Sequence, residues 1–199
     1  MTEHYYSAHP ESTPKLGLIR AHLCGRTFEF VSSSSVFSKK RVDTGTRLLI
    51  ESMVLPDRGT VLDVGCGYGV VGIAAAALHL GLKVVMTDVN VRAVRLAREN
   101  IERNRVANAE VRCGYLYEPV EDSTFNVILS NPPVSAGMEI VKAIITQAPS
   151  VMAPNATLQM VVKSKIGGKS LPALLETTFG NSSVLARESG YRVLTAEKR

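Results

Sequence analysis

The chain has 199 residues, of which 45% are hydrophobic and 21% charged, and its formal net charge is +5 at pH 7. This is the length of one large domain, or of one domain with an appendage, and no apolar run approaches the length of a membrane span. Three cysteines without a CxxC pair argue against a disulfide framework and a zinc ribbon. The first residues lack the apolar region of a secretory signal. We therefore expect a cytoplasmic protein with no membrane partner and no metal.

Residues 1–44 lack the rhythm of the rest and are predicted to form an N-terminal extension, with a strand at 26–31 and a loop from Ser32 to Ser35. In the second part, residues 45–199, strands and helices alternate. Strands are predicted at 60–65, 83–88, 109–114, 125–130 and 157–164, and helices at 70–80, 91–104, 138–152 and 169–180. Two last strands, 182–189 and 191–198, are joined at Gly190.

This alternation predicts an α/β fold with a doubly wound, mostly parallel sheet that helices cover on both faces. The two last strands are joined too tightly for a helical crossover, so one of them is expected to be antiparallel. In such a sheet, ligands bind at the carboxyl ends of the strands.

A glycine-rich turn, "DVGCGYGVVG", joins the first predicted strand of the sheet to a helix. Gly65, Gly67 and Gly69 allow a sharp turn and a close approach of the backbone to a ligand. The turn also matches the GxGxxG fingerprint of dinucleotide binding, so by itself it permits NAD. Asp63, directly before the first glycine, favours a cationic ligand over a pyrophosphate.

Asp88 ends the second predicted strand of the sheet, where a carboxylate can accept hydrogen bonds from both hydroxyls of a ribose. Asn90 follows as the predicted N-cap of the next helix. We expect both residues to belong to the cofactor site. An acidic residue that simply begins the helix is the alternative for Asp88.

The segment "SNPP" ends the fourth predicted strand in a stiff shape, because proline fixes φ and has no backbone N–H. The Asn131 side-chain oxygen and the Pro132 carbonyl are two acceptors that can bind the hydrogens of an amine and orient its nitrogen toward a methyl donor. We predict that Asn131, Pro132 and Pro133 form the catalytic segment. A rigid turn without a chemical role is the alternative.

Together, "DVGCGYG", "TDVN" and "SNPPVSAG" resemble class I S-adenosylmethionine-dependent methyltransferases with the Asn-Pro-Pro motif. The likeness is closest to the small-domain enzymes related to small-subunit rRNA guanine-N2 methyltransferases, and it extends over nearly the whole chain. It implies a Rossmann-like sheet of seven strands, with S-adenosylmethionine as the cofactor. The family's cofactor pocket corresponds here to Asp63, Gly65, Gly67 and Asp88, closed from the N-terminal side by Phe37, Asp43, Gly45 and Thr46.

The sequence departs from the family at two positions. The residue after Asn-Pro-Pro is commonly an aromatic that stacks on the target base, but here it is Val134. The third strand commonly brings an acidic residue to the adenine, whereas this chain has Tyr115, which we expect to pack against the adenine ring.

Lysines at 163, 165 and 169 follow the fifth predicted strand of the sheet, on the edge where a substrate would lie. We expect Lys163, Lys165 and Lys169, with Val134, to bind the substrate, because lysines can hold the phosphates of an RNA. The alternative is that these lysines belong to a basic surface that contacts only solvent. The four histidines show no metal-ligand spacing.

The sequence thus predicts a methyltransferase that acts on the exocyclic amine of a guanine in small-subunit rRNA, as a monomer or homodimer. Glutamine N5-methylation of a protein and adenine-N6 methylation use the same motif and stay open. An NAD-dependent oxidoreductase and an RNA-binding module without activity are alternatives from other classes.

Overall fold

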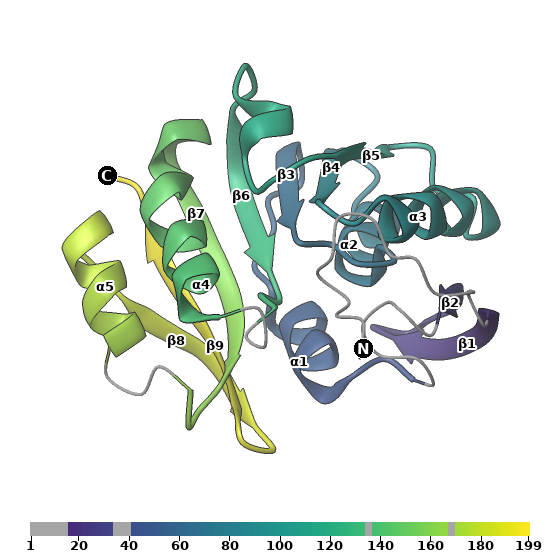
Figure 1. The fold of residues 1–199 in the computed structure, drawn as a ribbon, viewed down its shortest axis with the longest axis horizontal. Helices are drawn as coiled ribbons and strands as arrows, with labels where there is room; N and C mark the ends of the chain where they lie inside the picture. The colour runs from purple at the N-terminus through teal and green to yellow at the C-terminus, as the bar shows by residue number, and fades with distance from the viewer. Residues whose placement is uncertain (1–15, 34–40, 134–136, 167–169) are drawn as a thin grey trace.

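The protein is described by a computed structural model that covers residues 16–33, 41–133, 137–166 and 170–199. A seven-stranded sheet in the order β5-β4-β3-β6-β7-β9-β8 runs through the molecule, and a separate hairpin lies beside one end of it (Figure 1). The strands of the sheet are β3 (Gly59–Val64), β4 (Leu82–Asp88), β5 (Ala109–Cys113), β6 (Phe125–Ser130), β7 (Met152–Lys163), β8 (Ser183–Glu188) and β9 (Tyr191–Glu197). The hairpin consists of β1 (Leu16–Leu23) and β2 (Arg26–Ser33).

The helices connect the strands and cover the sheet on both faces. They are α1 (Thr44–Ser52), α2 (Val70–Leu78), α3 (Val91–Arg103), α4 (Met138–Gln147) and α5 (Ser170–Phe179), with short 3₁₀ helices η1 (Glu118–Val120) and η3 (Ala148–Val151). None of these helices combines the length and the apolar character that a membrane span requires.

The strand pairing confirms the predicted fold class. β3 pairs in parallel with β4 and β6, while β5 and β7 extend the parallel sheet on either side. β9 is antiparallel to both β7 and β8 and is the antiparallel strand expected near the C-terminus.

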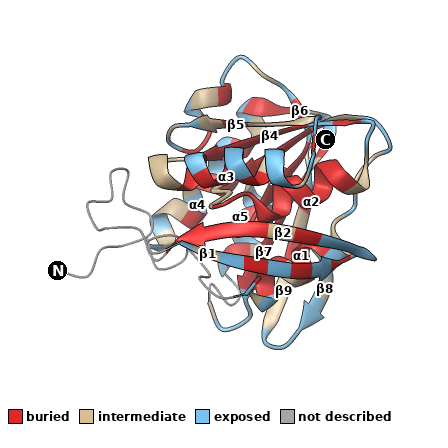
Figure 2. Ribbon diagram, turned by 90° about the vertical axis from the view of Figure 1, so that its right-hand side faces the viewer, coloured by how far each residue is buried: buried red, intermediate tan, exposed pale blue. Residues whose placement is uncertain are grey.

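Successive residues of the central strands enter two different cores, because side chains alternate across a sheet. Val61 and Val127 pack with α1, α2, α3 and the hairpin on one face. Leu62 and Ile128 pack with α4 and α5 on the other face. Figure 2 shows the buried residues along the strands and the inner sides of the helices. The carboxyl ends of the strands are thereby held in fixed relative positions.

Two asparagines of α3 attach the hairpin to the rest of the molecule. The Asn100 side chain accepts a hydrogen bond from the Val31 backbone N–H at 2.7 Å and donates one to the Val31 carbonyl at 3.0 Å. Asn104 makes the same pair of bonds with Glu29, at 3.0 and 2.8 Å. The two amides thus occupy the edge of β2 in the way that a third strand would.

Two local expectations were wrong, and two elements were not predicted. Ser32 and Ser33 are buried residues of β2, paired with Gly17 and Leu16, rather than the start of a loop; their partner strand β1 was not predicted. Helix α1 was also missed. The helix expected at 138–152 ends at Gln147, because Pro149 cannot continue it, and β7 begins at Met152.

Candidate active site

A cavity of about 230 Å³ opens at the carboxyl ends of β3, β4 and β6. It brings together residues that are far apart in the sequence, as expected for the ligand site of a parallel sheet. The predicted site residues that line it are Asp43, Thr46, Asp63, Gly65, Gly67, Asp88, Tyr115, Asn131, Pro132 and Pro133.

The glycine turn between β3 and α2 presents bare backbone to this cavity. Gly65 and Gly67 have φ values of 71° and 58°, which only glycine adopts without strain. A Cβ added at Gly67 would meet no atom within 4 Å, so it would project into the open space of the cavity. Gly69, with φ 93°, is instead the N-cap of α2, and it is not among the lining residues.

The Asp88 carboxylate is held at the cavity rim by two backbone donors. Its Oδ2 accepts a hydrogen bond from the Gly67 N–H and its Oδ1 one from the Asn90 N–H, both at 2.8 Å. Burial raises the pKa of Asp88, and these two hydrogen bonds oppose the rise. Each oxygen keeps a further lone pair, so the carboxylate can still accept hydrogen bonds from a diol.

Asn90 is the N-cap of α3, as predicted: its side-chain oxygen accepts hydrogen bonds from the backbone N–H groups of Arg92 and Ala93 at 2.9 and 3.2 Å. It is fully buried and lies outside the residues that line the cavity. Asn90 therefore orients the start of α3 beside Asp88.

Asp63 is a buried carboxyl group at the floor of the cavity. It is 1% exposed, and its Oδ2 accepts a hydrogen bond from the Gly72 N–H at 2.8 Å. Burial raises the pKa of Asp63 to about 7, the Gly72 hydrogen bond opposes this rise, and the charge of Asp88 adds to it. Burial also raises the pKa of the neighbouring Cys66 thiol, which fits a packing role rather than a nucleophilic one.

Asn131 follows β6 and connects to the start of α1. Its side-chain Nδ2 donates a hydrogen bond to Thr46 Oγ1 at 2.8 Å, and it lies 3.4 Å from Asp43 Oδ2. Pro132 is buried and Pro133 half-buried beside it, and Pro133 Cδ lies 3.9 Å from the position of a Cβ on Gly65. The Asn-Pro-Pro segment therefore faces the glycine turn across the cavity.

Sequence reasoning missed much of the apolar wall. Ile140 and Ile144, one helical turn apart on α4, line the cavity, and so does Leu116. The i, i+4 spacing of the two isoleucines in the helix that follows Asn-Pro-Pro was the available signal. Tyr115 is 42% exposed at the rim.

Other predicted residues lie elsewhere. Gly45 is buried in α1 against Tyr191, whose ring atoms would lie 2.9 Å from a Cβ added there. Lys163 and Lys165 are exposed near the end of β7, outside the cavity. Phe37, Val134 and Lys169 fall outside the described residues. Within the described ranges, His, Cys, Asp and Glu side chains form no group that could hold a metal ion.

The doubly wound sheet, the glycine turn, the acidic residue at the end of β4 and the Asn-Pro-Pro segment at the end of β6 define an α/β domain of the methyltransferase type. Residues 27–195 match the family of the methyltransferase small domain, and the chain belongs to this family. This membership decides against the NAD-dependent oxidoreductase that the glycine turn alone allowed.

Several named proteins are similar to this chain in sequence or structure. The uncharacterized protein YbxB of Bacillus subtilis (strain 168) is 39% identical over the full length of both chains. Ribosomal RNA small subunit methyltransferase C of Photorhabdus laumondii subsp. laumondii is 30% identical over 82% of this chain and 48% of its own. The T. thermophilus 16S rRNA N2 G1207 methyltransferase (RsmC), solved with AdoMet and guanosine, superposes with a TM-score of 0.84 at 27% identity. That match covers 96% of this chain and 52% of RsmC, so the chain spans about half the length of these methyltransferase C relatives.

Proposed function

We propose that this chain is a cytoplasmic S-adenosylmethionine-dependent methyltransferase that acts on the exocyclic N2 amine of a guanine in small-subunit rRNA. The observation that carries the proposal is the placement of Asn131 and Pro132 at the end of β6, across the cavity from the glycine turn. The likeness to RsmC, which was solved with AdoMet and guanosine, supports the choice of guanine over adenine or glutamine.

The chemistry of the cavity lining suits S-adenosylmethionine. The open space in front of Gly67 accommodates a ligand against bare backbone, and Asp88 has free lone pairs for a ribose diol. The Asp63 carboxylate is close enough to the glycine turn to attract the positive end of the cofactor. When bound, S-adenosylmethionine supplies an electrophilic methyl group on a cationic sulfur.

Asn131 and Pro132 would orient the amine that receives this methyl group. An aromatic amine is a weak nucleophile because its lone pair is delocalised into the ring. The Asn131 Oδ1 and the Pro132 carbonyl can accept its two hydrogens, which favours a pyramidal nitrogen with its lone pair directed into the cavity. Both acceptors are rigid, so they require little reorganisation in the transition state.

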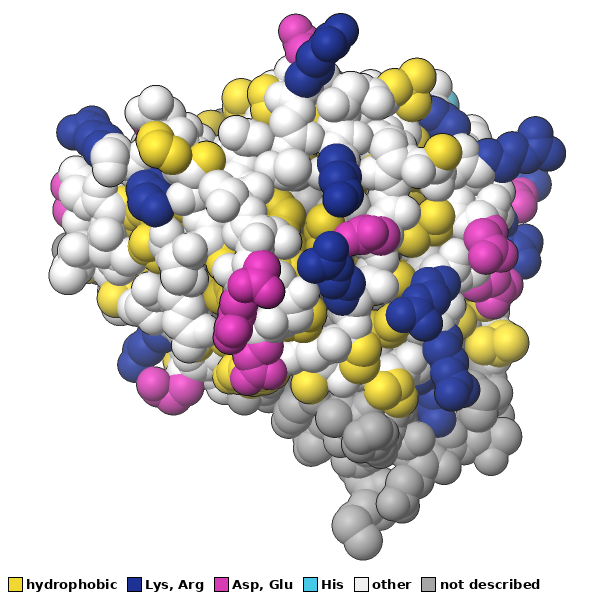
Figure 3. All heavy atoms as spheres, turned by 90° about the horizontal axis from the view of Figure 1, so that it is seen from above, with side chains coloured by type: hydrophobic (Ala, Val, Ile, Leu, Met, Phe, Trp, Pro, Cys, Tyr) yellow, Lys and Arg dark blue, Asp and Glu magenta, His cyan; other side chains and the backbone are white. Residues whose placement is uncertain are grey.

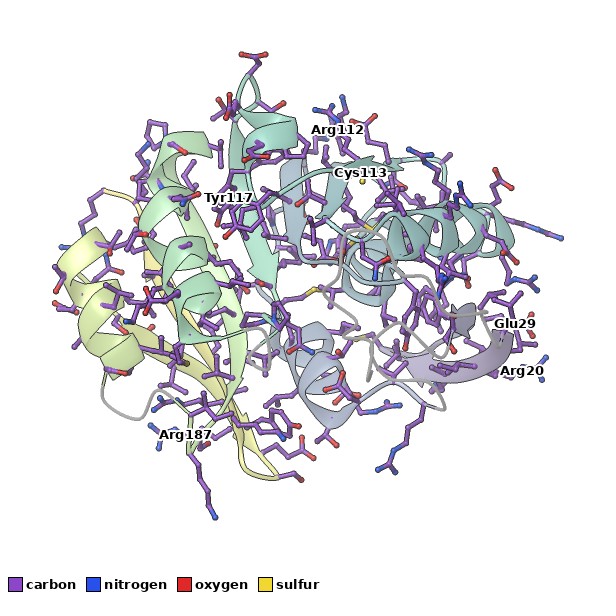
Figure 4. The ribbon with its side chains drawn as sticks, in the orientation of Figure 1. Arg20, Glu29, Arg112, Cys113, Tyr117 and Arg187 are labelled. Carbon is purple, nitrogen blue, oxygen red and sulfur yellow. The ribbon has the colours of Figure 1, made fainter. Side chains whose placement is uncertain are left out.

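The RNA backbone would cross the neighbouring end of the sheet. Lys163 ends β7, the strand next to β6. Arg187 of β8, which is labelled in Figure 4, stands directly opposite Arg192 of β9. Like charges in such a cross-strand pair disfavour folding, so a bound phosphate would relieve their repulsion. At the other end of the molecule, seen from above, basic and acidic side chains alternate (Figure 3).

The direct test uses methyl-labelled S-adenosylmethionine with unmodified small-subunit rRNA, assembled small subunits, tRNA and a total-protein extract. We expect label in the rRNA or the small subunit, recovered as N2-methylguanosine after nucleoside digestion. Label in the protein fraction would support glutamine methylation instead, and methyladenosine would support the adenine alternative. Label in none of them would overturn the proposal.

A further inference from the structure

Asp43 and Thr46 bind the nitrogen atom of the Asn131 amide. A carboxylate only accepts hydrogen bonds, so the Asn131 atom that lies 3.4 Å from Asp43 Oδ2 must be the NH₂ nitrogen. The Thr46 hydroxyl donates its single proton to the same Asp43 oxygen, so it can only accept from Asn131, at 2.8 Å. The hydrogen bonds therefore run in one direction, from Asn131 through Thr46 to Asp43.

The acceptor end of this network is itself held in place. Asp43 is the N-cap of α1, and its Oδ1 accepts hydrogen bonds from the backbone N–H groups of Gly45 and Thr46 at 2.9 and 3.2 Å. The helix that follows is anchored in the core by Leu49 and Ile50. Rotation of the Asp43 side chain would break these capping bonds as well as the bond to Thr46.

The consequence falls on the other half of the Asn131 amide. With Nδ2 bound to Thr46 and Asp43, Oδ1 points away from them, and it accepts no hydrogen bond from the described residues. Asp43, Thr46 and Asn131 all line the cavity. A free carbonyl oxygen held toward an amine is what acceptance of an N–H requires.

We infer that Asp43 and Thr46 are positioning residues, which hold the Asn131 amide so that its oxygen receives an N–H of the substrate amine. This inference rests on the proposed function. It assigns to the segment before β3 a role in orienting the substrate, in addition to capping α1 and lining the cavity. Without the network, the amide could turn over and present its NH₂ group to the substrate, where two donors would face each other.

The Asp43→Asn variant separates this role from helix capping. Its Oδ1 still caps α1, but an NH₂ group replaces the oxygen that faces Thr46. That group donates to Thr46, whose proton then goes to Asn131, so the amide is expected to invert. Thr46→Val removes the hydroxyl and keeps the shape and the backbone N–H, while Thr46→Ser keeps the hydroxyl and is the matched control.

The first readout needs neither cofactor nor activity. In ¹⁵N-labelled, ligand-free protein, the Asn131 side-chain NH₂ signals are assigned by their loss in Asn131→Ala. In the wild type, we expect the Asn131 NH₂ protons to exchange slowly with water and to show a contact with the Thr46 methyl group. In Asp43→Asn and Thr46→Val, we expect these protons to exchange faster. Unchanged exchange in both variants would overturn the inference, whatever substrate the protein has.

The second readout is kinetic. We expect turnover to fall about 100-fold in Asp43→Asn and Thr46→Val, the scale for one preorganised polar contact, with cofactor affinity within about threefold of wild type. Thr46→Ser, which keeps the hydroxyl, should recover most of the turnover that Thr46→Val loses. Loss of cofactor affinity in proportion to turnover would show that the residues only line the pocket and would overturn the inference. If the wild type methylates no RNA, the proposed function fails, and the NMR comparison still decides the orientation of the amide.

Discussion

Asp63 shows how burial can prepare a single residue for a charged ligand. Its carboxyl group is 1% exposed, and burial raises its pKa to about 7, so the neutral and charged forms are close in free energy near physiological pH. A cationic ligand stabilises only the charged form. Binding of such a ligand beside Asp63 would therefore be coupled to loss of its proton.

From this coupling we predict that affinity for S-adenosylmethionine falls as the pH drops through 7. Below the pKa, binding must first remove a proton, so affinity at pH 6 is expected to be about tenfold weaker than at pH 8. Calorimetric titration at the two pH values measures the ratio. Asp63→Asn, which retains an acceptor for the Gly72 N–H, should bind weakly and without this dependence. The same pH profile in both proteins would contradict the role given to Asp63.

The proposed role of Asn131 is at the reacting atom rather than on the cofactor. We predict that Asn131→Ala lowers turnover about 10²–10³-fold, the scale for loss of one preorganised contact to the transition state. Cofactor affinity should stay unchanged, because the ribose and the methionine end are assigned to other residues. Single-turnover methyl transfer and a cofactor titration separate the two effects. Wild-type turnover in this variant would remove Asn131 from the mechanism.

At the scale of elements, α3 and the β1–β2 hairpin depend on one another. The Asn100 side chain is fully buried and bonds the backbone of Val31 and the Tyr68 carbonyl, at 2.7 to 3.0 Å. It thus links the hairpin, α3 and the turn that forms the cavity. A polar side chain in this position replaces hydrogen bonds that β2 would otherwise need from a further strand.

We predict that Asn100→Ala lowers the free energy of unfolding by about 3 kcal/mol, because it leaves several buried backbone groups without partners. The equivalent change in Asn104, which is less buried, should cost about 1 kcal/mol, since water can replace part of its bonds. Urea denaturation measures both variants. An equal loss of unfolding free energy in the two variants would mean that burial of the asparagine does not determine the cost of removing its hydrogen bonds.

At the scale of the whole molecule, charge is placed unevenly with respect to the sheet. Lys163, Arg187 and Arg192 gather at the end where β7 and β8 finish, and burial together with the charge of Arg187 lowers the pKa of Arg192. A fold that keeps two opposed arginines there loses some stability. Opposed basic residues of this kind are common on surfaces that bind phosphates, where the phosphate lies favourably between them.

We predict that Arg187→Glu makes the protein slightly more stable and weakens its binding to RNA. An opposite-charge pair with Arg192 contributes about 0.2–1 kcal/mol, while the loss of one phosphate contact should lower the salt slope of log K by about 1. Thermal melts and RNA titrations at several salt concentrations test both parts. Lys83→Glu, the same change of charge at the start of β4, is the control and should leave the slope as it is. Equal slopes in the two variants would contradict the proposed path of the RNA.

The sequence by itself determined the order of strands and helices from β3 onward, the glycine turn and the N-cap at Asn90. It also determined where Asp88 and Asn131 follow a strand. These features depend on hydrophobic period and on turn chemistry, both of which act over a few neighbouring residues. Because parallel strands end at one edge, the sequence also predicted that Asp63, Asp88 and Asn131 would meet.

Only the tertiary structure decided what depends on distant partners. Ser32 and Ser33 are strand residues because β1 and the asparagines of α3 bind the backbone hydrogen-bonding groups of β2. The local sequence of β2 does not predict these partners. The orientation of the Asn131 amide depends on Asp43, 88 positions earlier in the chain. An amide can donate or accept, and its partners decide which it does. Packing, rather than the residue type, therefore decides which atom of the Asn131 amide is left to face the cavity.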